Sequence, residues 1–122
     1  MVTEQGSQTA KKAAALRAVE SERSPEERIL HDPYAATFAG PEEVEQARQR
    51  AQKRPGTRLL HALRTRCIDE HVRRSLQQGA EQDVIFGAGY DSTALRLEEM
   101  SRSRSGLNRT GSSYVNGREG RR

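Results

Sequence analysis

Residues 83–91, DVIFGAGYD, join a short apolar run to two closely spaced glycines. Residues 84–86 form a short, apolar and β-prone run, which is the one convincing strand in the sequence. The run passes directly into Gly87-Ala88-Gly89, and residues 92–100 return to a helical pattern. The sequence therefore predicts a buried strand that ends in a glycine turn and leads into a helix.

This predicted turn suits a nucleotide-like ligand. Gly87 and Gly89 let the backbone approach a ligand with no Cβ in the way. The N-terminus of the next helix offers free amides and the positive end of a dipole. Asp91 at that terminus could cap the helix or accept a hydrogen bond from a ligand amine or hydroxyl. The stretch lacks the third glycine of the dinucleotide fingerprint, so on these residues alone a plain strand-to-helix turn stays equally open.

Helical segments are predicted ahead of the strand from helix propensity, capping signals and apolar periodicity. They cover residues 9–20, 34–39, 41–54 and 57–78. Asp32-Pro33 is the start signal of the second segment, and Pro55-Gly56 separates the third from the fourth. A capping-box spacing from Ser24 to Glu27 marks a further helix start.

The last of these helices carries an apolar stripe. It begins with Leu59, Leu60, Leu63 and Cys67, and Ile68, Val72 and Leu76 continue it. A stripe of this kind predicts a face that packs on the core. We therefore expect Cys67 to be a core residue and not a nucleophile.

Composition divides the chain into regions. The 122 residues suffice for one small domain, and its core must be aliphatic and thin because Trp is absent and only five residues are Phe or Tyr. Residues 1–100 carry a net charge of −1, whereas residues 101–122 carry +5 and are mostly Ser, Gly, Arg and Asn. We expect a loose terminus over 1–8, a folded part over 9–100 and a disordered basic tail over 101–122.

Several classes of protein and site are disfavoured. No apolar run approaches the ~20 residues of a membrane span, and the first residues lack the apolar segment of a secretory signal. A cytoplasmic location without a membrane partner is the expectation. A single cysteine excludes an internal disulfide and a Cys-rich zinc site, and the scattered His31, His61 and His71 lack metal-ligand spacing, so no metal is expected.

Residues 83–97 resemble the first motif of the leucine carboxyl methyltransferase family, which uses S-adenosyl-L-methionine. Three further stretches are similar to the family's and follow in its order. These are residues 17–20 (RAVE), 31–34 (HDPY, followed by Phe38) and 64–70 (RTRCIDE). The resemblance covers about residues 9–100.

This resemblance implies an α/β fold. The chain would be the N-terminal fragment of a doubly wound, Rossmann-like methyltransferase domain, mostly helical with one clear strand at about 83–86. S-adenosyl-L-methionine would bind at the carboxyl ends of the strands of such a sheet.

The resemblance also implies a set of cofactor-binding residues. Gly87, Ala88 and Gly89 would line the methionine and ribose part of the cofactor. Asp91, together with Arg96, would hold the turn and the helix that follows it.

Arginines are the implied partners of the cofactor's carboxylate, because the guanidinium fork matches a carboxylate bidentately. The family pattern favours Arg66 over Arg64 for this role. Arg17 matches a basic contact in the family's first helix.

The implied reaction is the in-line displacement of a methyl group from a sulfonium, so the protein mainly positions the acceptor and the methyl group. The acceptor would be a carboxylate or hydroxyl of a small molecule or a protein. A hydroxyl would need a general base and a carboxylate would not. The sequence identifies no catalytic residue.

The chain departs from the family after residue 100. A doubly wound sheet needs roughly 180 residues at about 30 per βαβ unit. No acid occurs between Glu99 and Glu119 to hold the ribose hydroxyls. The composition changes after about Arg104, and the hypothesis is that unrelated residues follow there, from truncation or a shifted reading frame. Methyl transfer by this chain would then be weak or absent.

An alternative interpretation is a non-enzymatic helical module whose Arg-rich tail binds RNA or another acidic partner. The positive charge lies in the tail and not on predicted folded faces, so nucleic acid is the less expected partner.

Overall fold

A computed structural model describes residues 4–86, 89–97, 107–109 and 113–117. The chain forms two compact units, Met1–Cys67 and Ile68–Arg122, and the longest helix runs from the first into the second. The elements are α1 (Glu4–Ser21), α2 (Ala35–Ala39), α3 (Pro41–Lys53), α4 (Pro55–Gln77), β1 (Gln82–Phe86), α5 (Thr93–Arg96), β2 (Leu107–Arg109) and β3 (Ser113–Gly117).

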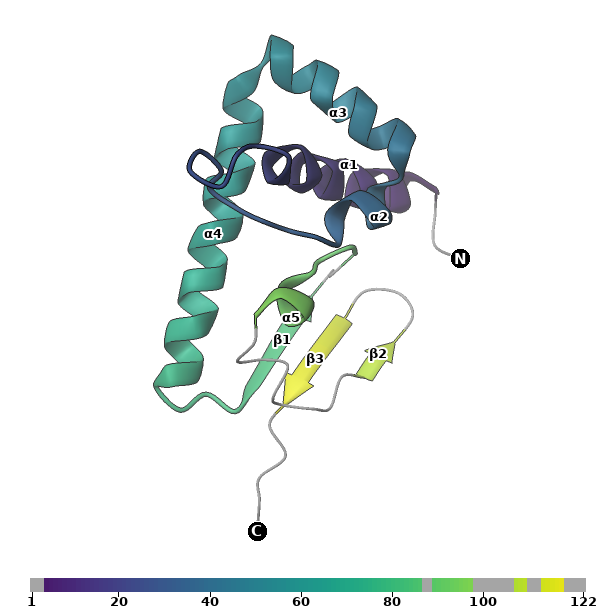
Figure 1. Ribbon diagram of the computed structural model, residues 1–122. Coiled ribbons are helices and arrows are strands. Elements are labelled where there is room, and N and C mark those ends of the chain that lie inside the picture. The colour runs from purple at the N-terminus through teal and green to yellow at the C-terminus, as the bar shows by residue number, and fades with distance from the viewer. Residues whose placement is uncertain (1–3, 87–88, 98–106, 110–112, 118–122) are drawn as a thin grey trace. The chain divides into compact units, whose positions relative to one another are not determined.

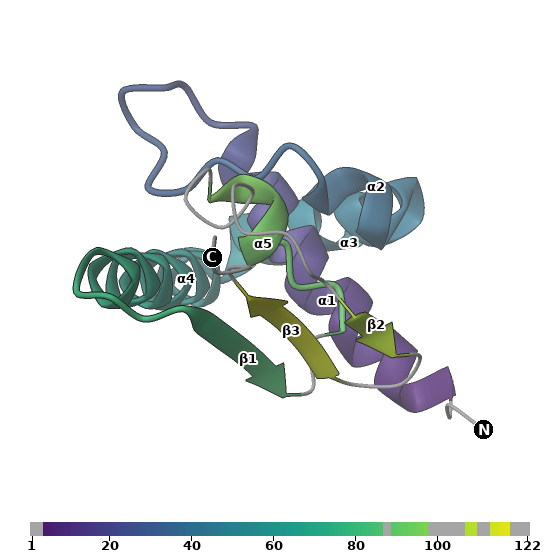
Figure 2. The same ribbon diagram turned by 90° about the horizontal axis from the view of Figure 1, so that it is seen from below.

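The first unit is built on α1, which packs against α2 and α3 (Figures 1 and 2). Its buried apolar side chains are small, so the helices approach closely. They are Ala14, Ala15, Ala18, Val19, Leu30, Ala35, Ala39, Val44, Ala47 and Ala62. The core is therefore aliphatic and thin, as the composition predicted.

Asp32 ties α1 to the start of α2. Its Oδ1 accepts hydrogen bonds from the backbone amides of Tyr34 and Ala35, at 2.9 and 3.1 Å. Its Oδ2 lies 2.9 Å from Nε of Arg17 on α1, and its own amide donates to the Ser21 hydroxyl at 2.8 Å. The carboxylate thus caps one helix and neutralises a buried cation on another, and the predicted start signal at Asp32-Pro33 is confirmed.

A second buried carboxylate, Glu20, fixes the loop that follows α1. It is fully buried, accepts a hydrogen bond from the Ile29 amide at 2.7 Å, and pairs with Arg58 of α4. Because burial of a charge without partners is costly, these contacts are what keep Glu20 inside the unit.

Four predicted helices are confirmed, with small changes at their ends. The first begins at Glu4, inside the segment expected to be loose. The capping-box stretch at Ser24, in contrast, forms an isolated turn in which the Glu27 and Arg28 amides donate to the Ser24 carbonyl. The chain leaves helical geometry there because the next amide, of Ile29, is held by Glu20.

The predicted burial of the α4 stripe is wrong. Leu60 is 70% exposed, Leu59 and Leu63 are 40% and 48% exposed, and Cys67 is exposed as well. Ala62 is the residue of this segment that enters the core. Helical periodicity identified the apolar face correctly, but in the described part of the chain α4 uses a neighbouring face for packing.

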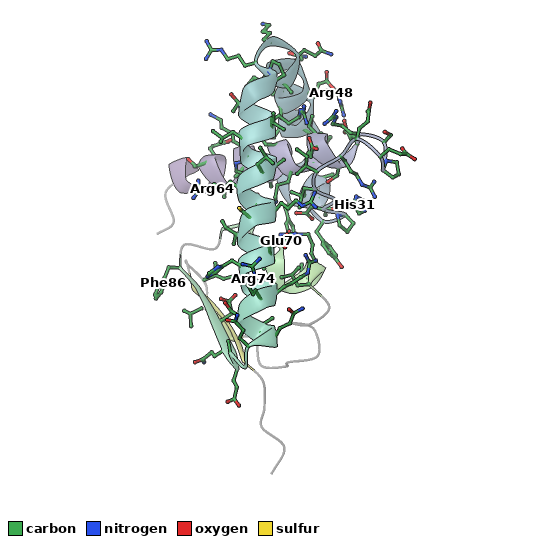
Figure 3. All side chains as sticks on the ribbon, turned by 90° about the vertical axis from the view of Figure 1, so that its left-hand side faces the viewer. His31, Arg48, Arg64, Glu70, Arg74 and Phe86 are labelled. Atoms are coloured by element: carbon green, nitrogen blue, oxygen red, sulfur yellow. The ribbon has the colours of Figure 1, made fainter. Side chains whose placement is uncertain are left out.

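The expected burial of the strand at 84–86 is wrong, because Val84 is 43% exposed and Phe86, which projects from the strand in Figure 3, is 83% exposed. The strand itself is confirmed as β1. It pairs antiparallel with β3, which pairs antiparallel with β2, in the order β1-β3-β2 (Figure 1). Val84 lies opposite Val115 in this register. The described residues are thus mostly helical with a strand after α4, and the parallel pairing of a doubly wound sheet is not found among them.

The tail differs from the expected disorder where it is described. Residues 107–109 and 113–117 are strands β2 and β3. The backbone amides and carbonyls of β1 need partners, and β3 provides them within the second unit, while β2 pairs with the other edge of β3. The remaining residues of 101–122 lie outside the described part.

No helix among the described residues is both long and apolar enough to cross a membrane.

The contacts of Asp32 give a first prediction. Replacing Asp32 by Asn removes the negative charge beside Arg17 but keeps an acceptor for the α2 amides. We expect the free energy of unfolding, measured by urea titration, to fall by about 3 kcal/mol, because breaking a buried pair leaves a charge uncompensated. The exposed Glu22–Arg48 pair is the control, since Glu22→Gln should change stability little. Equal losses in the two variants would contradict the role given to Asp32.

Candidate cofactor-binding site

The chain reverses direction after β1 at Gly89 and Tyr90 and then enters α5. Gly89 has φ = +52°, in the left-handed region that glycine adopts without strain. It is exposed, so its backbone is accessible. Gly87 and Ala88, two of the predicted cofactor-binding residues, lie outside the described residues. The strand, turn and helix of the sequence prediction are confirmed, with α5 shorter than expected.

Asp91 caps the first turn of α5. Its carboxylate accepts hydrogen bonds from the Thr93 amide at 3.1 Å and from the Thr93 hydroxyl at 3.0 Å. Asp91 is nevertheless exposed, so both oxygens retain capacity for a further donor. The capping role is therefore present, and a ligand contact stays a prediction.

Arg96 holds α5 against α4. Its guanidinium contacts both carboxylate oxygens of Asp69, with Nη2 3.1 Å from Oδ1, and its Nε donates to the Ser92 hydroxyl at 2.7 Å. The side chains of Arg96 and Asp69 are each 6% exposed. This buried bidentate pair fixes the helix that follows the glycine turn. The role expected for Arg96 in holding turn and helix agrees with this geometry.

Asp69, which holds Arg96 in place, was not singled out from the sequence. Its partner lies 27 residues away, so no local pattern connects the two. The adjacent Glu70 is exposed, which fits the rule that neighbouring helical residues point apart.

Asp83 is a second residue that sequence reasoning did not single out. Its Oδ2 is buried and has no hydrogen-bond partner among the described residues. Burial, followed by the negative charge of Asp91, raises the pKa of the Asp83 carboxyl, and a hydrogen bond with the Val84 backbone opposes the rise. The one feature of the sequence that could have pointed to Asp83 is its place as an acid at the start of an apolar strand. The Asp91 carboxylate thus acts on the Asp83 carboxyl at this turn.

The three arginines that were predicted to contact the cofactor belong to the other unit, Met1–Cys67. Arg17 is 7% exposed and bonded to Asp32, while Arg64 and Arg66 are exposed on α4. The pKa of His61 is lowered by burial and then by the positive charges of Arg17 and Arg64. The structure therefore brings Arg17 and Arg64 near one imidazole. Arg66 is not among the charges that act on His61.

Known proteins are similar to this chain over most of its length. A family model of leucine carboxyl methyltransferases matches residues 10–105, which is most of the sequence.

The chain belongs to the leucine carboxyl methyltransferase family.

Two curated relatives are similar over the same region, and each is named as a "putative S-adenosyl-L-methionine-dependent methyltransferase". The protein from Frankia alni is 30% identical over 100 residues, which are 74% of this chain and 34% of the relative. The protein from Streptomyces coelicolor is 34% identical over 98 residues, which are 73% of this chain and 33% of the relative. The chain therefore spans about a third of the length of these relatives. No solved structure matches it.

Gly89, Asp91 and Arg96 lie on the matched region, as do Arg17, Arg64 and Arg66. No group of three or more His, Cys, Asp or Glu in the described part of the chain could hold a metal ion.

The Arg96–Asp69 pair gives a second prediction. In Asp69→Asn the bidentate ion pair is lost, and α5 should open more often. We expect the Arg96 and Leu97 amides, which bond to Ser92 and Thr93, to exchange with deuterium at least about tenfold faster, equivalent to about 1.4 kcal/mol of local stability. Glu70→Gln, at the neighbouring exposed position, should leave these rates unchanged. Unaltered exchange in Asp69→Asn would show that α5 is held by other contacts.

The carboxyl pair gives a third prediction. In a carbon-detected NMR titration, the pKa of Asp83 should lie above its ordinary value of 3.8 and should fall in Asp91→Asn, because a neighbouring negative charge is removed. Glu81→Gln, at an exposed position beside β1, serves as the control.

A raised pKa means that the folded state holds the proton more tightly than the unfolded chain does. Asp83 therefore favours folding at low pH, and this contribution is lost as pH rises through the folded-state pKa.

Proposed function

We propose that this chain is the cofactor-binding N-terminal part of an S-adenosyl-L-methionine-dependent methyltransferase and that the turn at Gly89 holds the cofactor. The observation that carries the proposal is an exposed glycine in left-handed conformation, between β1 and α5, on the motif that the family shares. The names of the two relatives support the same methyl donor.

The residues at the turn fit such a ligand. Gly89 offers a backbone with no side chain to block approach, and the exposed Asp91 offers acceptors for amino or hydroxyl groups. The buried Oδ2 of Asp83 is an acceptor without a donor among the described residues. Gly87 and Ala88 would complete the lining. S-adenosyl-L-methionine, when bound, supplies a methyl group already activated on sulfonium.

Arginine is proposed to hold the carboxylate of the cofactor. The family pattern favours Arg66, which is exposed on α4 and has no ion pair among the described residues. Arg64 is the second candidate. Arg17, which donates its Nε to Asp32, is proposed as a third candidate because it matches a basic contact in the family's first helix.

We further propose that β1 is the first strand of the doubly wound sheet typical of this cofactor class. The acceptor would be a carboxylate or hydroxyl group, of a small molecule or a protein. The family match ends at residue 105, beside the change in composition after about Arg104. This coincidence supports the hypothesis that unrelated residues follow, and methyl transfer is proposed for the protein that carries the remaining strands.

A fourth prediction concerns cofactor binding. Titration of the chain with S-adenosyl-L-methionine, followed by amide NMR shifts, should move resonances of residues 89–97. Binding should be weak, because no acid between Glu99 and Glu119 can hold the ribose hydroxyls. Arg66→Gln should weaken it by about tenfold, since a charge-assisted hydrogen bond contributes about 1.5 kcal/mol or more.

Matched glycine variants provide the control. Gly89→Ala adds a Cβ where φ is positive and should abolish the shifts. Gly56→Ala, on the first turn of α4, places its Cβ in open space and should leave them unchanged. Identical shifts in both variants, or no shift at millimolar cofactor, would remove the basis for placing the methyl donor at this turn.

A further inference from the structure

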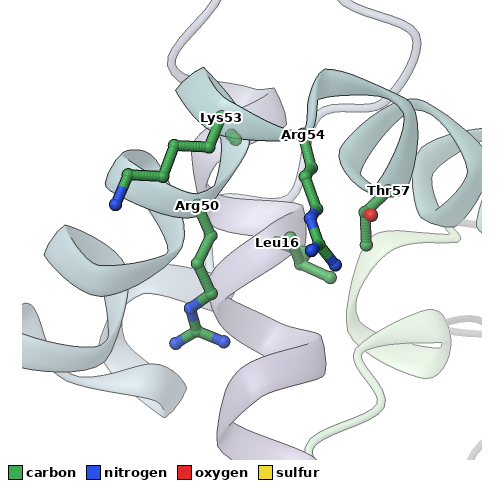
Figure 4. Close-up of a pocket in the computed structure, with 6 residues that line it drawn as sticks. Leu16, Arg50, Lys53, Arg54 and Thr57 are labelled. Carbon is green, nitrogen blue, oxygen red and sulfur yellow. The ribbon is translucent and has the colours of Figure 1, made fainter.

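The first unit contains a pocket of about 290 Å³ between α1, the end of α3 and the start of α4 (Figure 4). It is lined by Leu16, Arg50, Ala51, Lys53, Arg54 and Thr57. Its volume is near the lower end of the range for small-molecule sites, about 300–1,000 Å³. None of its lining residues belongs to the candidate cofactor site, so this pocket needs a separate explanation.

The wall of the pocket is mostly apolar. Leu16 of α1 and Ala51 of α3 contribute hydrocarbon, and the alkyl stems of the basic residues add to it. Figure 4 shows the side chains of Arg50 and Arg54 extending alongside Leu16. A hollow of this kind favours an occupant with an apolar body, because water in it gains few hydrogen bonds.

The polar groups on the lining are almost all cationic. Arg50 lies 2.7 Å from Glu43 and is therefore partly neutralised. Lys53 and Arg54 have no ion pair with any residue in the described part of the chain. No acid is among the lining residues. The pocket thus carries uncompensated positive charge beside an apolar wall.

Basic residues at the end of α3 have an ordinary structural explanation, since cations favour the C-terminus of a helix. That explanation accounts for charges on the helix surface. It does not account for two unpaired cations beside a hollow formed with residues of α1 and α4. The combination of hollow and charge is what points to a ligand.

We propose that this pocket binds a small organic anion with an apolar body, in the class of medium-chain monocarboxylates. The carboxylate would pair with Arg54, whose fork can bind both oxygens, and with Lys53. The tail would lie against Leu16 and Ala51. Inorganic phosphate or acetate would satisfy the cations but leave the apolar wall uncovered, so an amphipathic anion matches the lining better. This site is independent of the proposed methyl-donor site.

A fifth prediction tests the proposal on the full chain by calorimetry, with octanoate as the probe. Octanoate should bind with one-to-one stoichiometry. Octanol lacks the carboxylate and acetate lacks the long apolar tail, so each should bind at least about tenfold more weakly. Added salt should weaken octanoate binding, because part of the affinity is electrostatic.

Three variants separate pocket binding from general charge effects. Arg54→Gln should weaken octanoate about tenfold. Ala51→Leu keeps every charge but fills the hollow, and it should weaken octanoate at least as much. Arg28→Gln removes a cation that does not line the pocket and should leave affinity unchanged. Circular dichroism melts verify that each variant is folded.

Two results would overturn the proposal. One is equal affinity for octanoate and octanol, which would show that the ligand binds only through its apolar tail and that the cations contribute nothing. The other is an equal effect of Arg54→Gln and Arg28→Gln, which would reduce it to net charge. Gly89→Ala should not alter octanoate affinity, so a failure at the cofactor turn and a failure at this pocket are distinguishable.

Discussion

The first unit depends on the buried carboxylate of Asp32. This group pairs with an arginine of α1 and accepts hydrogen bonds from backbone amides at the start of α2. Its alanine-rich core buries little surface per residue, so burial alone orients α1 and α2 only loosely. The directional hydrogen bonds to the Asp32 carboxylate fix the orientation of α1 relative to α2. Because the carboxylate is itself enclosed, each bond also offsets the cost of removing charge from water.

The second unit repeats this device at the candidate cofactor site. Asp69 on α4 receives the guanidinium of Arg96, and Arg96 also receives support from Ser92. A four-residue helix has little stability of its own, because helix nucleation is costly. The ion pair holds this turn of helix in place and with it the exit from Gly89. The conformation of this turn thus depends on residues that lie outside it in the sequence.

Local signals predicted much of the fold. The helix start at Pro41 and the strand at 84–86 follow from residues adjacent in sequence, and they are confirmed. The fourth helix begins at Pro55, two residues before the predicted start at residue 57. The partners of β1 and the Asp69–Arg96 pair could not be predicted, because they join residues far apart in the chain. The burial of Asp83 is equally non-local. Within the site, the glycine turn was predictable from the local sequence and the role of Arg96 from the family resemblance, whereas Asp69 as the partner of Arg96 was not.

The leucines of α4 have a practical consequence. Leu59, Leu60 and Leu63 place solvent-facing hydrocarbon on a single helix, with Leu60 70% exposed. Contiguous apolar surface favours contact between molecules as their number per volume rises. Preparations of this chain should therefore be compared at several dilutions, so that the behaviour of single molecules is separated from that of clusters.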